Sequence, residues 1–137
     1  MSIVDLSVLK LERYLKNQRK SSNMKEQTKK RYETLLSLMK PHGPITGRAM
    51  FGGYGFYFNK IIFGILVGET LYFRVGQINE KDFEPYKSEP FVYEGKNRPI
   101  VMSYLTLPDK VLHNPKLLPK WIEKARDASL QSRTKRK

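Results

Sequence analysis

The chain has 137 residues, enough for one domain with a real hydrophobic core, and no cysteine, which excludes disulfide bonds and thiolate metal sites. Its net charge of +13 lies mainly at the two ends. Residues 1–40 hold ten Lys and Arg against four acids, residues 41–108 hold seven against six, and residues 109–137 hold nine against three. Basic ends around a nearly neutral middle favour solvated helix faces and a tail, and they also allow contact with nucleic acid.

The first element predicted along the chain is an amphipathic helix over residues 3–20. Val4, Val8, Leu11 and Leu15 are spaced 4, 3, 4 and form one apolar stripe. A basic helix of this kind lies on a membrane, binds a partner or packs back on its own domain. The stripe has no aromatic residue, which favours packing on the domain. Residues 1–23 are therefore interpreted as an N-terminal helical extension.

A second helix is predicted from about residue 24, with Asn23 and Glu26 as a capping box. Its apolar face has i, i+3, i+4, i+7 spacing, and the proline-rich segment 41–44 ends it. Three strands follow at residues 48–58, 61–67 and 71–75, joined by tight turns. This part of the chain predicts an antiparallel meander.

The rest of the chain predicts a mixture of helices and strands. A short helix over residues 78–86, with Asn79 as a cap, precedes a strand pair at 91–94 and 99–107. One helical turn at 108–113 and an amphipathic helix over 118–129 follow. We expect residues 130–137 to be a basic tail, disordered from Ser132.

The sequence gives no targeting or membrane-spanning segment. Its longest near-continuous apolar run, Ile61 to Val67, is far too short to cross a bilayer. The N-terminus has an early acid and no basic start before an apolar block, unlike a secretory signal. We therefore expect a cytoplasmic protein.

Three glycines at positions 52, 53 and 55 pose the main chemical question, because glycine-rich loops also bind phosphate. A phosphate loop needs a helix directly after the glycines, and here a strand and a turn follow. We interpret the glycines as a bulge or bend within one strand.

No other pattern indicates catalysis or a cofactor. His42 and His113 have no metal-ligand spacing, so we expect no metal site. We interpret the acids Glu80, Asp82 and Glu84 as a solvated face of the short helix. We expect no catalytic residue, no cofactor and no enzyme activity.

Three blocks resemble the N-terminal domain of the TfoX/Sxy family of bacterial competence regulators: RAMFGGYGFYF at 48–58, LYFRV at 71–75 and EPFVYEGKNRPIVMSYLTLP at 89–108. The likeness runs from about residue 31 to about residue 128. The most specific positions form a motif whose role is mainly structural: Arg48, Met50, Phe51, Gly52, Gly53, Gly55, Met102, Ser103 and Tyr104.

The resemblance implies an α+β fold: a two-layer antiparallel sheet with helices on one face, in the order α-β-β-β-α-β-β-α. Residues 24–129 would form this domain, with the N-terminal helix as an addition. The fold is similar to that of secretion chaperones, which are commonly dimers, so a homodimer is an open possibility. Because full-length family members have a second helical domain and this chain ends at Lys137, we expect a single-domain member.

The resemblance also implies a non-enzymatic regulatory or adaptor domain that acts by protein–protein contact in natural competence and DNA transformation. The implied partner is the cyclic-AMP receptor protein or the transcription machinery. The alternative is a small nucleic-acid-binding accessory protein that uses its cationic ends. For Arg48 we favour a structural contact over recognition. The candidate contacts for an anionic partner are Arg48, Arg98, Arg133, Lys135, Arg136 and Lys137.

Overall fold

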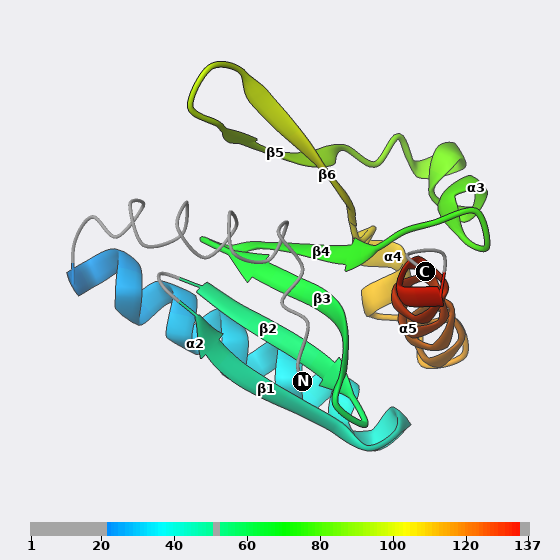
Figure 1. The fold of residues 1–137 in the computed structure, drawn as a ribbon. Helices are drawn as coiled ribbons and strands as arrows, with labels where there is room; N and C mark the ends of the chain where they lie inside the picture. The colour runs from blue at the N-terminus through cyan, green and yellow to red at the C-terminus, as the bar shows by residue number, and fades with distance from the viewer. Residues whose placement is uncertain (1–21, 51–52, 135–137) are drawn as a thin grey trace.

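The computed structural model describes residues 22–50 and 53–134, and the helix predicted over residues 3–20 lies outside them. The fold is α+β, with one antiparallel sheet in the order β1-β2-β3-β4-β6-β5 (Figure 1). The elements are α2 (Ser22–Met39), η1 (Lys40–His42), β1 (Ile45–Met50), β2 (Gly53–Phe58), β3 (Ile61–Val67), β4 (Thr70–Arg74), α3 (Glu80–Phe83), η2 (Glu84–Tyr86), β5 (Pro90–Glu94), β6 (Pro99–Thr106), α4 (Asp109–Leu112) and α5 (Leu118–Thr134).

The prediction of one bent strand over residues 48–58 is wrong, because this stretch belongs to two strands. Strand β1 ends at Met50, β2 begins at Gly53, and these two residues face each other in an antiparallel pair. The sheet therefore has one strand more than predicted. Gly53 and Gly55 lie within β2, so a strand and not a helix continues from them, as the rejection of a phosphate loop required. These two glycines belong to the second strand of a hairpin and do not bend a single strand.

The predicted turns and the later strands are confirmed. Asn59 and Lys60 join β2 to β3 with φ of 48° and 74°, the left-handed conformation of a two-residue hairpin turn. Gly68, with φ of 61°, opens the next turn. The strand pair predicted at 91–94 and 99–107 matches β5 and β6 to within one residue.

A β-bulge in β3 fixes which side chains reach the core. Tyr57 pairs with Ile62 and Phe56 pairs with Gly64, so Phe63 is an extra residue in β3. Without this insertion Phe63 and Leu66, three residues apart, would point to opposite faces of the sheet. With it, both pack into the same hydrophobic cluster.

Helices α2 and α5 cover one face of the sheet, which we call the first face. Leu35 and Met39 of α2 and Ile122 and Ala125 of α5 share a buried cluster with strand residues such as Phe73. These residues lie on the two amphipathic helices that the apolar spacing predicted. The predicted two-layer arrangement is therefore present, with the sheet as one layer and the helices as the other (Figure 1).

Two helix ends differ from the prediction. Helix α2 already includes Ser22, so Asn23 lies within the helix and is not its N-cap. Helix α5 continues to Thr134, so residues 132–134 are helical rather than part of a disordered tail. Residues 135–137 lie outside the described part of the chain.

Gly47 allows α2 to approach β1 closely. A Cβ atom at this position would collide with the ring and hydroxyl of Tyr32. The Tyr32 ring cannot move aside easily, because it stacks on Tyr54 with ring centroids 3.9 Å apart and planes 9° from parallel. The absence of a side chain at Gly47 is therefore a packing requirement.

We expect Gly47→Val to lower the free energy of unfolding by about 1–3 kcal/mol, because the added side chain forces the helix and strand apart. Urea denaturation would measure the loss, with Thr46→Val at the neighbouring exposed position as the control. In a background with Tyr32→Ala the cost should become much smaller. An equal cost in both backgrounds would contradict this origin.

The stacked tyrosines Tyr32 and Tyr54 lead to a second prediction, which concerns how the free energy of unfolding depends on pH. Burial raises the pKa of Tyr32 above its usual value, and Tyr54 and Glu33 add to the shift. Burial and Glu33 also raise the pKa of Tyr54. These two phenols therefore ionise at lower pH in the unfolded chain than in the folded chain. The stabilisation that the neutral phenols contribute is complete below about pH 10, and it is lost as the pH rises through their folded-state pKa values.

We expect the free energy of unfolding to fall above about pH 10, and to fall less steeply in Tyr54→Phe. The variant keeps the ring stack but has one phenol fewer to ionise. Urea denaturation at several pH values from 8 to about 11 would test this. Identical slopes for the wild-type and variant chains would show that these phenols do not contribute.

Candidate functional site: the β5–β6 hairpin and the second face of the sheet

The surface of the sheet opposite α2 and α5, which we call the second face, is also apolar. Ile65 of β3 packs there with four buried residues of the β5–β6 hairpin, namely Phe91, Tyr93, Met102 and Tyr104. Burial raises the pKa of Tyr93, in keeping with a site removed from water. The partly buried members of this cluster are Met50, Ile62, Val67, Tyr72 and Ile100.

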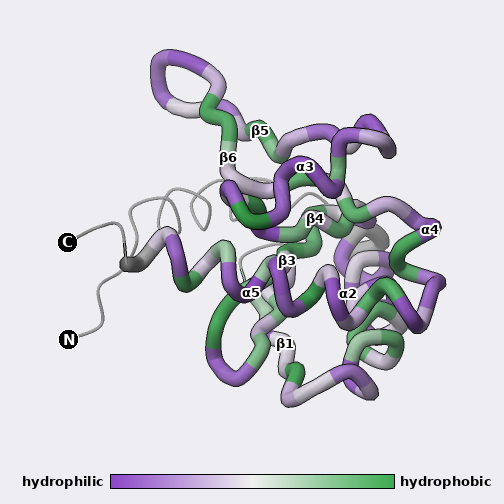
Figure 2. Tube along the Cα trace, turned by 90° about the vertical axis from the view of Figure 1, so that its right-hand side faces the viewer, coloured by the Kyte–Doolittle hydropathy of each residue, from purple (hydrophilic) through white to green (hydrophobic). Residues whose placement is uncertain are grey.

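The β5–β6 hairpin projects from the body of the domain because the β5–β6 ladder is irregular. Pro90 pairs with Leu105, but Val92 already pairs with Val101, so β6 contains two more residues than β5 between these pairs. The extra length falls at Met102–Tyr104, the Met-Ser-Tyr block. Such irregularities bend a strand, and the hairpin leaves the sheet at this point (Figures 1 and 2).

The hairpin has an exposed apolar outer surface. Val92 and Val101 face each other across the two strands, with 40% and 66% of their surfaces exposed. Among the described strands, β4 pairs with β6 only from Tyr104 to Thr106, so the outer half of β6 has β5 as its single partner. The loop at the tip is hydrophilic and contains Lys96 and Arg98 (Figure 2). Apolar side chains, open backbone and cations suit contact with another protein.

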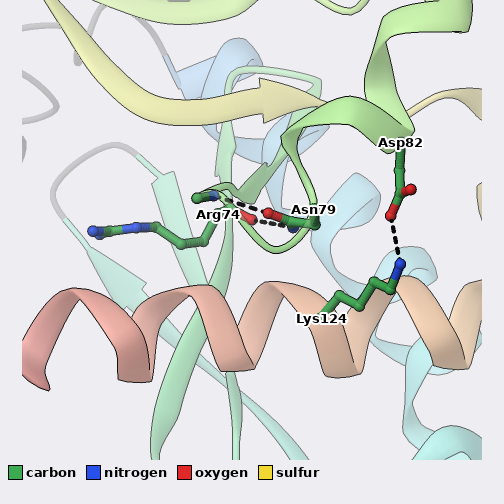
Figure 3. Close-up of polar contacts among 5 residues, drawn as sticks. Arg74, Asn79, Asp82 and Lys124 are labelled. Atoms are coloured by element: carbon green, nitrogen blue, oxygen red, sulfur yellow. Dashed lines mark hydrogen bonds and ion pairs between the residues drawn. The ribbon is translucent and has the colours of Figure 1, made fainter.

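A buried asparagine holds the segment that leads from β4 toward this hairpin (Figure 3). Asn79 is 2% exposed; its side-chain amide donates to the carbonyl oxygen of Arg74 at 3.0 Å and its oxygen accepts from the Gly76 N–H at 2.8 Å. Asn79 occupies the predicted N-cap position of α3, but its side chain makes no capping bond. One turn later Asp82 forms an ion pair with Lys124 of α5 at 3.0 Å.

The side chain of Arg74, whose carbonyl oxygen accepts from Asn79, extends toward the hairpin. Its guanidinium lies over the ring of Tyr104, 5.6 Å from the ring centroid. Its Nε atom is buried without a hydrogen-bond partner. The ring contact therefore supplies the main interaction of this cation within the described structure.

The structure does not bring the predicted anion contacts together. Arg48 is exposed on β1, on the same face as Met50, and lies opposite Gly55. Arg98 is exposed in the hairpin loop, and its carbonyl oxygen accepts from Gly95. Strands β1 and β6 are four positions apart in the sheet, about 19 Å. Within the described residues neither side chain has a salt bridge or hydrogen bond, so the favoured structural contact of Arg48 is not seen there.

The remaining predicted positions differ in whether they are buried, exposed or outside the described part of the structure. Met102 and Tyr104 are buried on the second face, whereas Ser103 is exposed and its carbonyl oxygen accepts from the Val75 N–H. Gly55 is buried, and a Cβ there would lie 3.4 Å from the Met50 sulfur, in keeping with a close approach. Outside the described part of the structure lie Gly52 and the side chains of Phe51, Arg133, Lys135, Arg136 and Lys137.

Within residues 22–50 and 53–134, no group of three or more His, Asp or Glu side chains is placed to bind a metal ion. Of the acids near α3, Asp82 is engaged by Lys124. None of the helices in the described ranges has the length and apolar character required to span a bilayer.

Residues 37–129 match the TfoX N-terminal domain family, and this range is well over half of the chain. The chain belongs to this family. A search of curated proteins gave no match. Met102 and Tyr104, two of the positions that carry the resemblance, are buried at the bend of the β5–β6 hairpin.

Sequence reasoning missed the exposed Val92–Val101 pair on the TfoX-type hairpin. The alternation of Phe91-Val92-Tyr93 and Ile100-Val101-Met102 could have indicated it, because each valine lies between two residues of one face. The aromatic residues and the methionine point inward, so the valines must point outward.

We expect Asn79→Ala to lower the free energy of unfolding by about 1–3 kcal/mol, because it leaves a part-buried N–H and a part-buried carbonyl without their partner. Asp82→Ala is the matched control; its ion pair is more than one-third exposed, so its loss should change stability by less than about 1 kcal/mol. Urea denaturation of both variants would measure the two costs. Equal costs would contradict the role given to Asn79.

Proposed function

We propose that this TfoX-type chain is a non-enzymatic regulatory or adaptor domain that acts by protein–protein contact. The outer surface of the β5–β6 hairpin makes the contact. The observation that carries the proposal is the exposed Val92–Val101 pair on a projecting, bent hairpin. Exposed apolar side chains cost solvation free energy, and a partner that covers them regains it.

The family relationship supports a finer form of this proposal. TfoX-type domains suggest regulation of natural competence and DNA transformation, so the partner is the cyclic-AMP receptor protein or another component of the transcription machinery. The cationic loop with Lys96 and Arg98 suits an acidic rim around the apolar contact on that partner.

One observation favours nucleic-acid binding as a second candidate function. Helices α2 and α5 cover the same face of the sheet, so their outward surfaces share one side of the molecule. Exposed Lys25, Lys29 and Lys30 lie on α2, and Lys120 lies on α5. A shared basic side could follow a phosphate backbone. The aromatic residues that stack on bases in single-strand binders are instead concentrated in the core and the second face.

We expect a photoreactive p-benzoylphenylalanine at position 101, introduced into the chain in its native cells, to cross-link one defined protein. The same group at the exposed Lys120 position of α5 is the control and should give no such adduct. With the photoreactive group at the neighbouring exposed Ser103 position, the additional change Val101→Asp should remove the adduct without lowering Tm.

Fluorescence anisotropy with duplex DNA tests the second candidate function, which is nucleic-acid binding. If no protein adduct forms at position 101, and DNA affinity falls steeply between 50 and 200 mM salt, the adaptor proposal is wrong. Replacement of Arg133, Lys135, Arg136 and Lys137 by glutamine should then weaken DNA binding and reduce its salt dependence.

A further inference from the structure

The two edge strands of the described sheet differ in how well they are protected against pairing with a further strand. Strand β5, at one edge, begins with Pro90, and its ladder with β6 is irregular. Strand β1, at the other edge, has no proline, and each of its residues pairs with β2 without a shift in register. Because prolines and irregular ladders hinder strand addition, β1 is the more open edge.

The outer side of β1 carries backbone groups that point away from β2. The Asn59 N–H donates to the carbonyl oxygen of Pro44, so these two residues form a hydrogen-bonded pair at the start of the β1–β2 ladder. Such pairs alternate with non-hydrogen-bonded pairs along an antiparallel ladder. The alternation directs the N–H and C=O groups of Ile45, Gly47 and Ala49 to the open edge.

These outward groups are largely available for a new strand. Within the described part of the chain, the Ile45 N–H donates to the carbonyl oxygen of Gly43, whereas the N–H groups of Gly47 and Ala49 have no acceptor outside β1. Ala49 is exposed, as is the neighbouring Thr46. Strand β1 also forms the lower border of the sheet in Figure 1. The edge is therefore accessible to a strand from outside the domain.

We propose that two copies of this chain pair through their β1 strands, antiparallel and about a two-fold axis at Gly47, so that two sheets become one continuous sheet. The two Gly47 residues exchange N–H···O=C hydrogen bonds, and each Ala49 N–H donates to the Ile45 carbonyl oxygen of the other copy. An antiparallel strand is complementary to itself under a two-fold rotation, so the same edge supplies the donors and the acceptors.

The charge and size of the β1 side chains favour this register and a second copy as the occupant. With the axis at Gly47, Arg48 lies opposite Thr46 of the other copy. An axis at Arg48 would place two guanidinium groups directly opposite each other, which is destabilising. Recognition of a foreign strand requires pockets for its alternate side chains, and the short side chains of Thr46 and Ala49 are poorly suited to form them.

Analytical ultracentrifugation of the purified full chain should show a reversible monomer–dimer equilibrium, with Kd between about 1 µM and about 1 mM for this small interface. Ala49→Pro removes an outward N–H that β2 does not use, and should raise Kd at least about tenfold. Ala49→Ser keeps this N–H and should leave Kd unchanged. A purely monomeric chain, or equal effects of the two variants, would overturn the proposal.

The proposed partner contact can be separated from this pairing, because β1 and the β5–β6 hairpin lie at opposite edges of the sheet. Val101→Asp should leave the monomer–dimer equilibrium unchanged. If Val101→Asp abolishes the dimer and Ala49→Pro does not, the hairpin is the self-association surface and the β1 proposal is wrong.

Charge substitutions test the register without removing a backbone group. Opposite Arg48 of the other copy, Thr46→Glu should lower Kd and Thr46→Lys should raise it, each by about 2- to 30-fold because the contact occurs twice. The same substitutions at the exposed Thr70, three strands away on β4, control for the change in net charge. Equal responses at positions 46 and 70 would contradict pairing about Gly47.

Discussion

The structure depends on a sheet that has apolar side chains on both faces, because each face must be removed from water. Helices α2 and α5 do this for the first face, around Leu35, Phe73 and Ile122. On the second face the hairpin contributes four of the five buried cluster residues. The sheet is therefore more than a support for two helices. Its second surface organises the β5–β6 hairpin.

Local irregularities in two strands direct side chains to these two faces. The extra residue Phe63 places Phe63 and Leu66 on the same side of β3, where both reach the helices. Met102 and Tyr104, two residues apart, share the second face by the ordinary alternation of a strand, and the two extra residues of β6 bend the hairpin. In a regular ladder Phe63 and Leu66 would point to opposite faces of the sheet. The irregularity in β3 therefore shapes the first-face core, and the one in β6 sets the course of the hairpin that carries the exposed Val92–Val101 pair.

Much of the fold could be predicted from the sequence because the periodic signals are strong. The apolar spacing in α2 and α5 and the alternation in β4 identified those elements. The strand β1 was missed because Ile45-Thr46-Gly47 looks like loop sequence after a proline-rich turn. Its strand character comes from pairing with Phe56 and Phe58 and from packing under Tyr32, which are tertiary effects. The bulges were missed for the same reason, since register depends on the partner strand.

The candidate site was less predictable, because a binding surface depends on which side chains remain exposed. The residues that carry the family resemblance, such as Gly55 and Met102, are largely buried and set the shape of the hairpin and the sheet. Val101 lies between two inward-pointing residues, so its side chain points outward and is 66% exposed. Motif residues such as Met102 and Tyr104 thus shape the hairpin, while in our proposal the neighbouring Val92 and Val101 make the contact. Arginines chosen from the motif blocks therefore form no common site: Arg48 lies on β1 and Arg98 in the loop before β6, and these strands are four positions apart in the sheet.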